Sequence, residues 1–130
     1  MENRMRRRHF ADADFLRVDD AYICVAMRMT CYVSIALPMY LAGYCRKNCY
    51  IVPNGALKSA KEHFKCSLQS VYVAVNELIA LDVIYKDKSQ RGSDILINPK
   101  YIWFGTERAR SKAIQEYDKI VELNKIGVNA

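Results

Sequence analysis

KCSLQSVYVAVNELIALDVIYKD, residues 65–87, is the stretch that decides the fold. Ser67 can cap a helix over 67–81, in which apolar residues recur at helical spacing: Val71, Ala74, Val75, Leu78 and Leu81. Another amphipathic helix, ALKSAKEHFK (56–65), precedes it. The turn between the two consists only of Lys65, where the first helix ends, and Cys66, and so short a turn forces the helices to cross steeply. The pattern predicts a helix-turn-helix.

Two strand-like segments follow, with a polar turn between them. VIYKD (83–87) and DILIN (94–98) carry β-branched and aromatic residues, and KSQRGS (88–93) contains Gly92. This predicts a two-stranded β-hairpin, or wing, beside the second helix of the pair. The fold that we expect for residues 14–105 is therefore a winged helix-turn-helix, mainly α with a small β-hairpin.

The segment before the helix pair predicts a basic arm and further helices. Residues 1–13 have the composition of a flexible basic arm. Asp19 or Asp20 can cap a short helix that continues to about residue 28, and Asn54 can cap the helix 56–65.

Between Arg28 and Arg46 lie seventeen uncharged residues, MTCYVSIALPMYLAGYC. This run reaches only the short end of the roughly 17–25 residues that a membrane span needs. A central helix that is buried on most sides gives the same pattern, and we expect that instead. Thr30 would start this helix, Pro38 would bend it, and it would end near Arg46 and Lys47.

The C-terminal region, 106–130, predicts an extra amphipathic helix. The aromatic residues of KYIWFG (100–105) are expected to pack on the domain. Thr106 can cap a helix over 107–124, and Gly127 would stop it. Its apolar stripe is wide enough to pack on its own domain or on a second copy of the chain, so a homodimer is one arrangement to consider.

The amino-acid composition limits the classes of protein to which the chain can belong. The 130 residues are 52% hydrophobic and carry a net charge of +6, which favours one folded domain with a polyanionic partner. MENRMRRRH is not followed by an apolar stretch, so we expect no secretory signal. The odd number of five cysteines then indicates reduced thiols in a cytoplasmic protein.

Metal binding and catalysis are the other functions that the sequence could support. Cys45, Cys49, His63 and Cys66 have the spacing C-x3-C-x13-H-x2-C, which offers four zinc ligands. Burial of the cysteines in the core explains the same residues, and we expect no metal and no other cofactor. The sequence contains no nucleophile elbow, phosphate loop or HExxH motif, so we do not expect an enzyme.

INPKYIWFGTERARSKAIQEY, residues 97–117, resembles the segment that follows the wing in RepL-type replication proteins of bacterial plasmids and phages. In those proteins a strand leads to an Asn-Pro pair, an aromatic cluster, a glycine and a basic helix. The corresponding residues here are Asn98, Pro99, Tyr101, Trp103, Phe104, Gly105, Arg108, Arg110 and Lys112. The resemblance covers roughly residues 15–120 and implies replication initiation or maintenance through DNA binding.

The chain departs from the usual helix-turn-helix pattern at three positions. Lys65 stands where a turn glycine is common, and Asp82 stands where a glycine often ends the second helix. Val73 stands where a basic residue often sits. This last departure bears on sequence-specific DNA reading more than on the fold.

The expected recognition surface has no positive charge from Ser67 to Asn76. Its residues are Ser67, Leu68, Gln69, Ser70, Tyr72, Val73 and Asn76. Gln69 and Asn76 can pair with adenine edges, and Leu68 or Val73 can pack on a thymine methyl group. Phosphate contacts would come from residues beside the turn and on the wing: Lys58, Lys61, Lys65, Lys86, Lys88 and Arg91.

The arm residues Arg4, Arg6, Arg7 and Arg8 can lie in a minor groove, or they can form a tail that only keeps the protein soluble.

These observations predict a duplex-DNA-binding protein, most simply in plasmid or phage replication, with replication or other host proteins as further partners and no membrane. A transcriptional regulator of the same shape is an alternative. A small factor that inhibits a host protein is another, because an uncharged helix with exposed Leu68, Tyr72 and Val73 also suits a protein partner.

Overall fold

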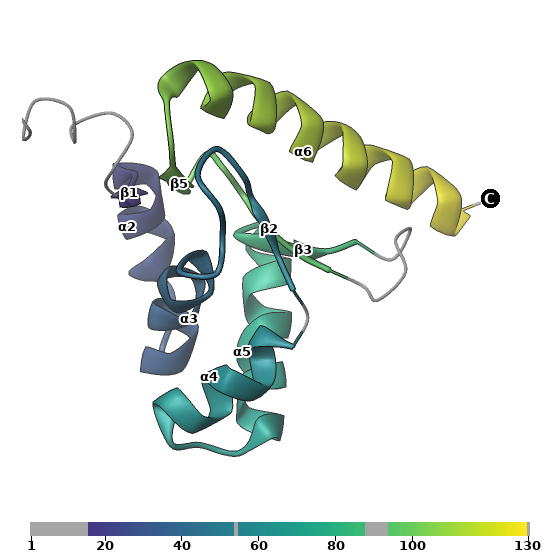
Figure 1. The fold of residues 1–130 in the computed structure, drawn as a ribbon. Coiled ribbons are helices and arrows are strands. Elements are labelled where there is room, and N and C mark those ends of the chain that lie inside the picture. The colour runs from purple at the N-terminus through teal and green to yellow at the C-terminus, as the bar shows by residue number, and fades with distance from the viewer. Residues whose placement is uncertain (1–15, 54, 88–93, 130) are drawn as a thin grey trace, which may run out of the picture.

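The computed structural model describes residues 16–53, 55–87 and 94–129, with side chains to residue 124 (Figure 1). This part of the chain is mainly helical. Its helices are α2 (Asp20–Ala26), α3 (Tyr32–Ala42), α4 (Ala56–Phe64), α5 (Leu68–Ala80) and α6 (Glu107–Asn129). Its strands are β1 (Leu16–Val18), β2 (Ile51–Val52), β3 (Ile84–Lys86), β4 (Ile95–Ile97) and β5 (Ile102–Phe104).

The strands form two small antiparallel sheets. β4 is the central strand of the larger sheet, with β3 on one side and β2 on the other. The predicted pairing of 83–87 with 94–98 is confirmed, since Ile84 lies opposite Ile97 and Lys86 lies opposite Ile95. The pairing of β2 with β4, and the second sheet of β1 and β5, were not predicted.

The larger sheet separates two hydrophobic clusters. Successive side chains of a strand point to opposite faces, so Ile95 and Ile97 of β4 face one way and Leu96 the other. The first two join the main core, which α3, α4 and α5 build. Leu96 joins a second cluster with Tyr50, Trp103, Ala113 and Tyr117, through which α6 packs. Figure 1 shows the resulting layers, with α6 across one face and α3–α5 on the other.

The bounds of α3 differ from those expected. The helix begins at Tyr32 rather than Thr30 and ends at Ala42, short of Arg46 and Lys47. It ends early because the amides of the next three residues, Gly43, Tyr44 and Cys45, donate to carbonyls three residues back, which winds the chain into tighter turns. Pro38 lies inside the helix. None of the described helices is both long and apolar enough to cross a bilayer.

Side-chain caps explain where three helices begin. The Oδ1 of Asp19 accepts from the Ala21 amide at 3.0 Å. The Oγ of Ser67 accepts from the Ser70 amide at 3.0 Å, and Thr106 Oγ1 accepts from the Ala109 amide at 3.2 Å. These three predicted caps are confirmed, whereas Asn54 lies outside the described residues. The expectation that Gly127 stops the last helix is wrong, because α6 continues to Asn129.

Candidate nucleic-acid interface

The turn between α4 and α5 depends on one residue in a left-handed conformation. Lys65 has φ 53° and ψ 49°, and it follows the last residue of α4. Its amide donates to the Glu62 carbonyl, and the Cys66 amide donates to the Lys61 carbonyl, which ends the helix. Ser67 then caps α5 directly. A left-handed lysine costs roughly 1–2 kcal/mol relative to a right-handed one, so this turn is tight at some expense in stability.

α5 presents an exposed, uncharged face. Its Val71, Ala74, Val75 and Leu78 are buried in the core. The residues that we call the outer face of α5 point the opposite way, at i, i+3, i+4 and i+7: Gln69, Tyr72, Val73 and Asn76. Val73 is 62% exposed and Tyr72 is 39% exposed. Two amide side chains with an apolar side chain between them are therefore open to a partner.

Three of the predicted recognition residues lie away from the outer face. The hydroxyls of Ser67 and Ser70 are 2.9 Å apart and are engaged with each other at the cap. Leu68 is half-buried beside α4, where it lines a shallow hollow with Lys58 and Lys61. The interpretation of Leu68 as an exposed side chain is wrong, because the short turn brings α4 against it.

Lysines flank the outer face on two sides. Lys58 and Lys61 on α4 and Lys65 in the turn are exposed, although Lys61 lies 3.8 Å from Glu62. On the strand side, Lys86 Nζ lies 5.5 Å from the centre of the Tyr72 ring, in a cation–π contact that sequence reasoning missed. The remaining predicted phosphate contacts lie outside the described residues: Arg4, Arg6, Arg7, Arg8, Lys88 and Arg91.

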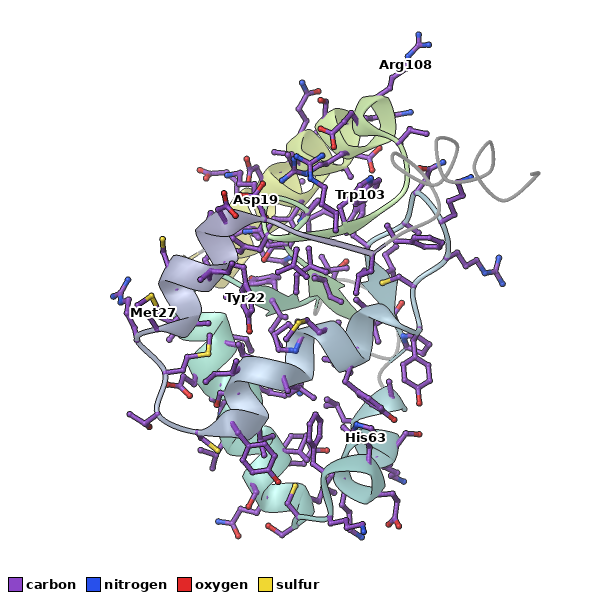
Figure 2. All side chains as sticks on the ribbon, turned by 90° about the vertical axis from the view of Figure 1, so that its left-hand side faces the viewer. Asp19, Tyr22, Met27, His63, Trp103 and Arg108 are labelled. Atoms are coloured by element: carbon purple, nitrogen blue, oxygen red, sulfur yellow. The ribbon has the colours of Figure 1, made fainter. Side chains whose placement is uncertain are left out.

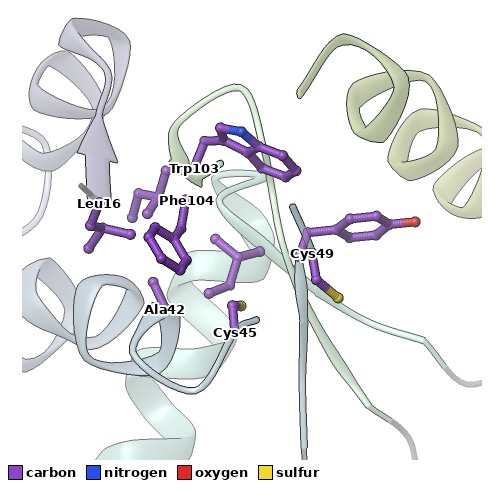
Figure 3. Close-up of a pocket in the computed structure, with 9 residues that line it drawn as sticks. Leu16, Ala42, Cys45, Cys49, Trp103 and Phe104 are labelled. Atoms are coloured by element: carbon purple, nitrogen blue, oxygen red, sulfur yellow. The ribbon is translucent and has the colours of Figure 1, made fainter. Parts of the chain in front are cut away.

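Two of the candidate zinc ligands, Cys45 and Cys49, line a small apolar cavity. Cys45 and Cys49 lie there with Trp103 and Phe104, and the cavity measures about 10 Å³, room for at most one water (Figure 3). Burial, and to a smaller extent the nearby Cys49, raises the pKa of the Cys45 thiol to about 12. His63 instead stacks on Tyr40, with 4.5 Å between ring centres.

Within the described ranges, no three His, Cys, Asp or Glu residues are placed to hold a metal ion. The four residues of the C-x3-C-x13-H-x2-C spacing are thus not brought together as a ligand set.

The basic helix of the 97–117 segment divides into structural and exposed residues. The Arg110 guanidinium donates to the Pro99 carbonyl at 2.9 Å and the Lys100 carbonyl at 2.8 Å, and it lies 3.1 Å from Asp19 Oδ2. Its side chain is only 13% exposed. Arg108, in contrast, points away from the domain (Figure 2). Arg110 therefore supports the fold and has little capacity left for a phosphate.

The Asn-Pro pair and the glycine of this segment also hold the fold. Asn98 is buried, and its Nδ2 donates to the Asp82 carbonyl at 2.8 Å just after α5. Its Oδ1 accepts from the Lys100 amide at 3.0 Å. Gly105 has φ +147°, and a Cβ there would lie 2.0 Å from Asn48 Oδ1. Asn98 therefore has a structural role through its hydrogen bonds, and Gly105 has one through its close approach to Asn48.

No family model matches the chain, and neither does any curated protein or solved structure. The resemblance to RepL-type proteins stays a prediction that rests on the sequence.

Proposed function

We propose that the protein is a winged helix-turn-helix protein that binds duplex DNA. In this proposal α5 lies in the major groove and the β3–β4 pair lies beside the phosphate backbone. The observation that carries it is the exposed outer face of α5 with lysines on both of its sides.

The outer face suits base contacts. Gln69 and Asn76 are seven residues apart on one helix, hence about 10 Å apart along its axis. That spans about three base steps at roughly 3.4 Å each. Each side chain can pair with an adenine edge, and Val73 between them can pack on a thymine methyl group. Two such contacts would give sequence preference without any charge on the outer face of α5.

Affinity would come from the flanking lysines. Lys65 stands at the N-terminal end of α5, where the helix dipole also favours a phosphate. Lys58 and Lys61 extend this side along α4. Lys86 serves the other side, held in place by its contact with Tyr72. Phosphate contacts position a protein on DNA and base contacts select the site, so a neutral reading helix is compatible with tight binding.

The biological role follows from the resemblance of residues 97–117 to RepL-type proteins. It favours replication initiation or maintenance of a plasmid or phage, with transcriptional regulation as the alternative. Both roles need the same DNA-binding surface.

A salt series tests the proposal. Binding to duplex DNA is measured by fluorescence anisotropy, and log affinity should fall linearly with log salt. Lys65→Ala and Lys86→Ala should each reduce the slope by about 0.9, the value of one phosphate contact. Gln69→Ala and Asn76→Ala should change sequence preference and leave the slope unchanged. Lys119→Ala, an exposed lysine on α6, is the matched control and should change neither.

A protein-binding factor remains the second candidate because Val73 is 62% exposed. Under that hypothesis Val73→Asp abolishes capture of a host protein, and Lys86→Ala has no effect. Absence of DNA binding even at low salt would reject the first proposal and favour this one.

A further inference from the structure

α2 turns an apolar face away from its own core. Its Tyr22 is buried and donates its hydroxyl to the Ile35 carbonyl, which fixes the helix on α3. Ile23 and Met27, on the other side, are 53% and 81% exposed. Large side chains that are this exposed and lie one turn apart mark a surface for a partner.

An apolar groove runs beside this face, between α2 and α3. Tyr22 and Met29 lie in it, Ile35 and Met39 line its α3 side, and Ile23 and Met27 line its α2 side. Figure 2 has this side of the molecule towards the viewer, with Tyr22 and Met27 labelled. One surface therefore carries both a groove and the protruding side chains that could fill such a groove, which is what a twofold interface requires.

The charges at the two ends of this face complement each other. Asp20 is the first residue of α2, and Arg28 comes just after Met27, the residue that caps the C-terminal end of the helix. Both are exposed, and neither has an ion pair within the described ranges. They lie about 12 Å apart along the axis at roughly 1.5 Å per residue. An antiparallel copy of α2 would bring each Asp20 to the other copy's Arg28.

We propose that α2 is the interface of a homodimer, in which two copies of the helix pack antiparallel about a twofold axis. Ile23 and Met27 of each copy fill the groove of the other, and two Asp20–Arg28 pairs set the direction. The middle residue between Asp20 and Arg28 is Cys24, which is exposed. Its thiol therefore lies near the axis, opposite the same thiol of the second copy.

This proposal is independent of DNA binding. Figure 1 places α2 and α3 on the side of the molecule away from β3. The variants that test one surface therefore leave the other intact.

Oxidative cross-linking of the full chain is the first test. Diamide takes two electrons and two protons from a pair of thiols, which join as a disulfide. The wild-type protein and Cys31→Ser should give a covalent dimer on denaturing gels without reductant, and Cys24→Ser should not. Cys31 is the matched control because it is also exposed and lies just beyond α2. A cross-link that survives Cys24→Ser and disappears in Cys31→Ser would overturn the proposal.

Sedimentation over a wide range of protein concentration is the second test and needs no oxidant. A helix as short as α2 buries a small area, so we expect a dimer that dissociates on dilution. Met27→Asp should remove the dimer, whereas Leu123→Asp, at a residue 56% exposed on α6, should not. Asp20→Arg should weaken the dimer, and the double variant Asp20→Arg with Arg28→Asp should restore it. A wild-type chain that is monomeric throughout, or a dimer indifferent to Met27→Asp, would reject this interface.

Discussion

The outer face of α5 and the start of α6 both carry residues of the types that contact DNA, but they use them differently. Around α5, Lys65 and Lys86 have exposed or half-exposed side chains beside a neutral helix face. At the start of α6, Arg110 is mostly buried and engages Asp19 and two carbonyl groups. A basic residue is thus available to a phosphate only where the fold has not already supplied it with acceptors.

The turns that precede α5 and α6 also differ in backbone conformation. The turn before α5 places a lysine in a left-handed conformation, where glycine would be less strained. The turn before α6 uses Gly105 at φ +147°, where no other residue fits. We therefore expect substitutions in the two regions to separate stability from DNA binding.

The largest effect is expected at Gly105. Gly105→Ala would place a Cβ 2.0 Å from Asn48 Oδ1 and 2.8 Å from the Asn48 amide nitrogen. Backbone and a side chain must both move, and the φ is unfavourable for alanine, so the free energy of unfolding should fall by about 3 kcal/mol or more. Urea denaturation measures this loss.

Gly55→Ala is the control for this substitution. A Cβ at Gly55 would meet nothing within 4 Å, and its φ is −60°. The free energy of unfolding of Gly55→Ala should equal that of the wild type or be slightly higher. Equal losses at both glycines would contradict the role given to Gly105.

Arg110 gives the next largest effect. Arg110→Ala removes the donor to the Pro99 and Lys100 carbonyls and to Asp19 Oδ2. We expect the free energy of unfolding to fall by about 2 kcal/mol. The salt dependence of DNA binding should stay unchanged, because the side chain is committed to the fold.

Arg108→Ala is the matched variant, since Arg108 is an exposed arginine on the same turn of α6. It should leave the unfolding free energy within about 0.5 kcal/mol of the wild type. If Arg110→Ala reduces the salt slope of DNA binding as much as Lys86→Ala does, Arg110 also contacts DNA and its purely structural role is wrong.

Asp19 makes this structural ion pair sensitive to acid. The Ala21 amide, and then Arg110, hold the pKa of Asp19 below its usual value of 3.8. A carboxyl whose pKa is lowered by folding stabilises the protein above that usual value, and the contribution is lost as the pH falls through the lower, folded pKa. Asp19→Asn should therefore cost about 1 kcal/mol at neutral pH and flatten the fall in stability below about pH 4.

Thermal unfolding as a function of pH checks this expectation. Asp118→Asn serves as its control, because Asp118 forms an exposed pair with Lys100 at 3.4 Å. Exposed pairs contribute little, so this variant should follow the wild-type pH profile.

Local sequence signals were sufficient for the helix pair and for the N-terminal caps of α2, α5 and α6. Ser67, Asp19 and Thr106 each bond to an amide two or three residues away, so the pattern that predicts them lies within one turn of helix. The outer face of α5 follows from helical periodicity in the same way. Leu68 was misjudged because its burial depends on α4, which periodicity within α5 does not describe.

Contacts between distant segments could not be predicted from these signals. The pairing of β1 with β5 joins segments that are far apart in the sequence, and β2 is only two residues long. The Lys86–Tyr72 contact depends on the direction in which the chain leaves α5 at Asp82, a left-handed residue with φ 61°. The resemblance to RepL-type proteins assigned Arg110 to a basic helix. Its structural role depends on Asp19, a partner far away in the sequence.

The smallest effect is expected at Lys65, where a single residue affects stability and DNA binding in opposite ways. Lys65→Gly removes the strain of a left-handed lysine at φ 53°. The greater freedom of glycine in the unfolded chain offsets part of this gain, so the free energy of unfolding should rise by about 0.5 kcal/mol. The same change removes a proposed phosphate contact, so DNA affinity and its salt slope should both fall, as in Lys65→Ala. Lys65→Ala, which keeps the left-handed strain, should not stabilise the protein. A residue that lowers stability but raises DNA affinity is expected at a binding surface. If Lys65→Gly is more stable and binds DNA as tightly as the wild type, Lys65 has no part in binding and the turn is only a strained connection.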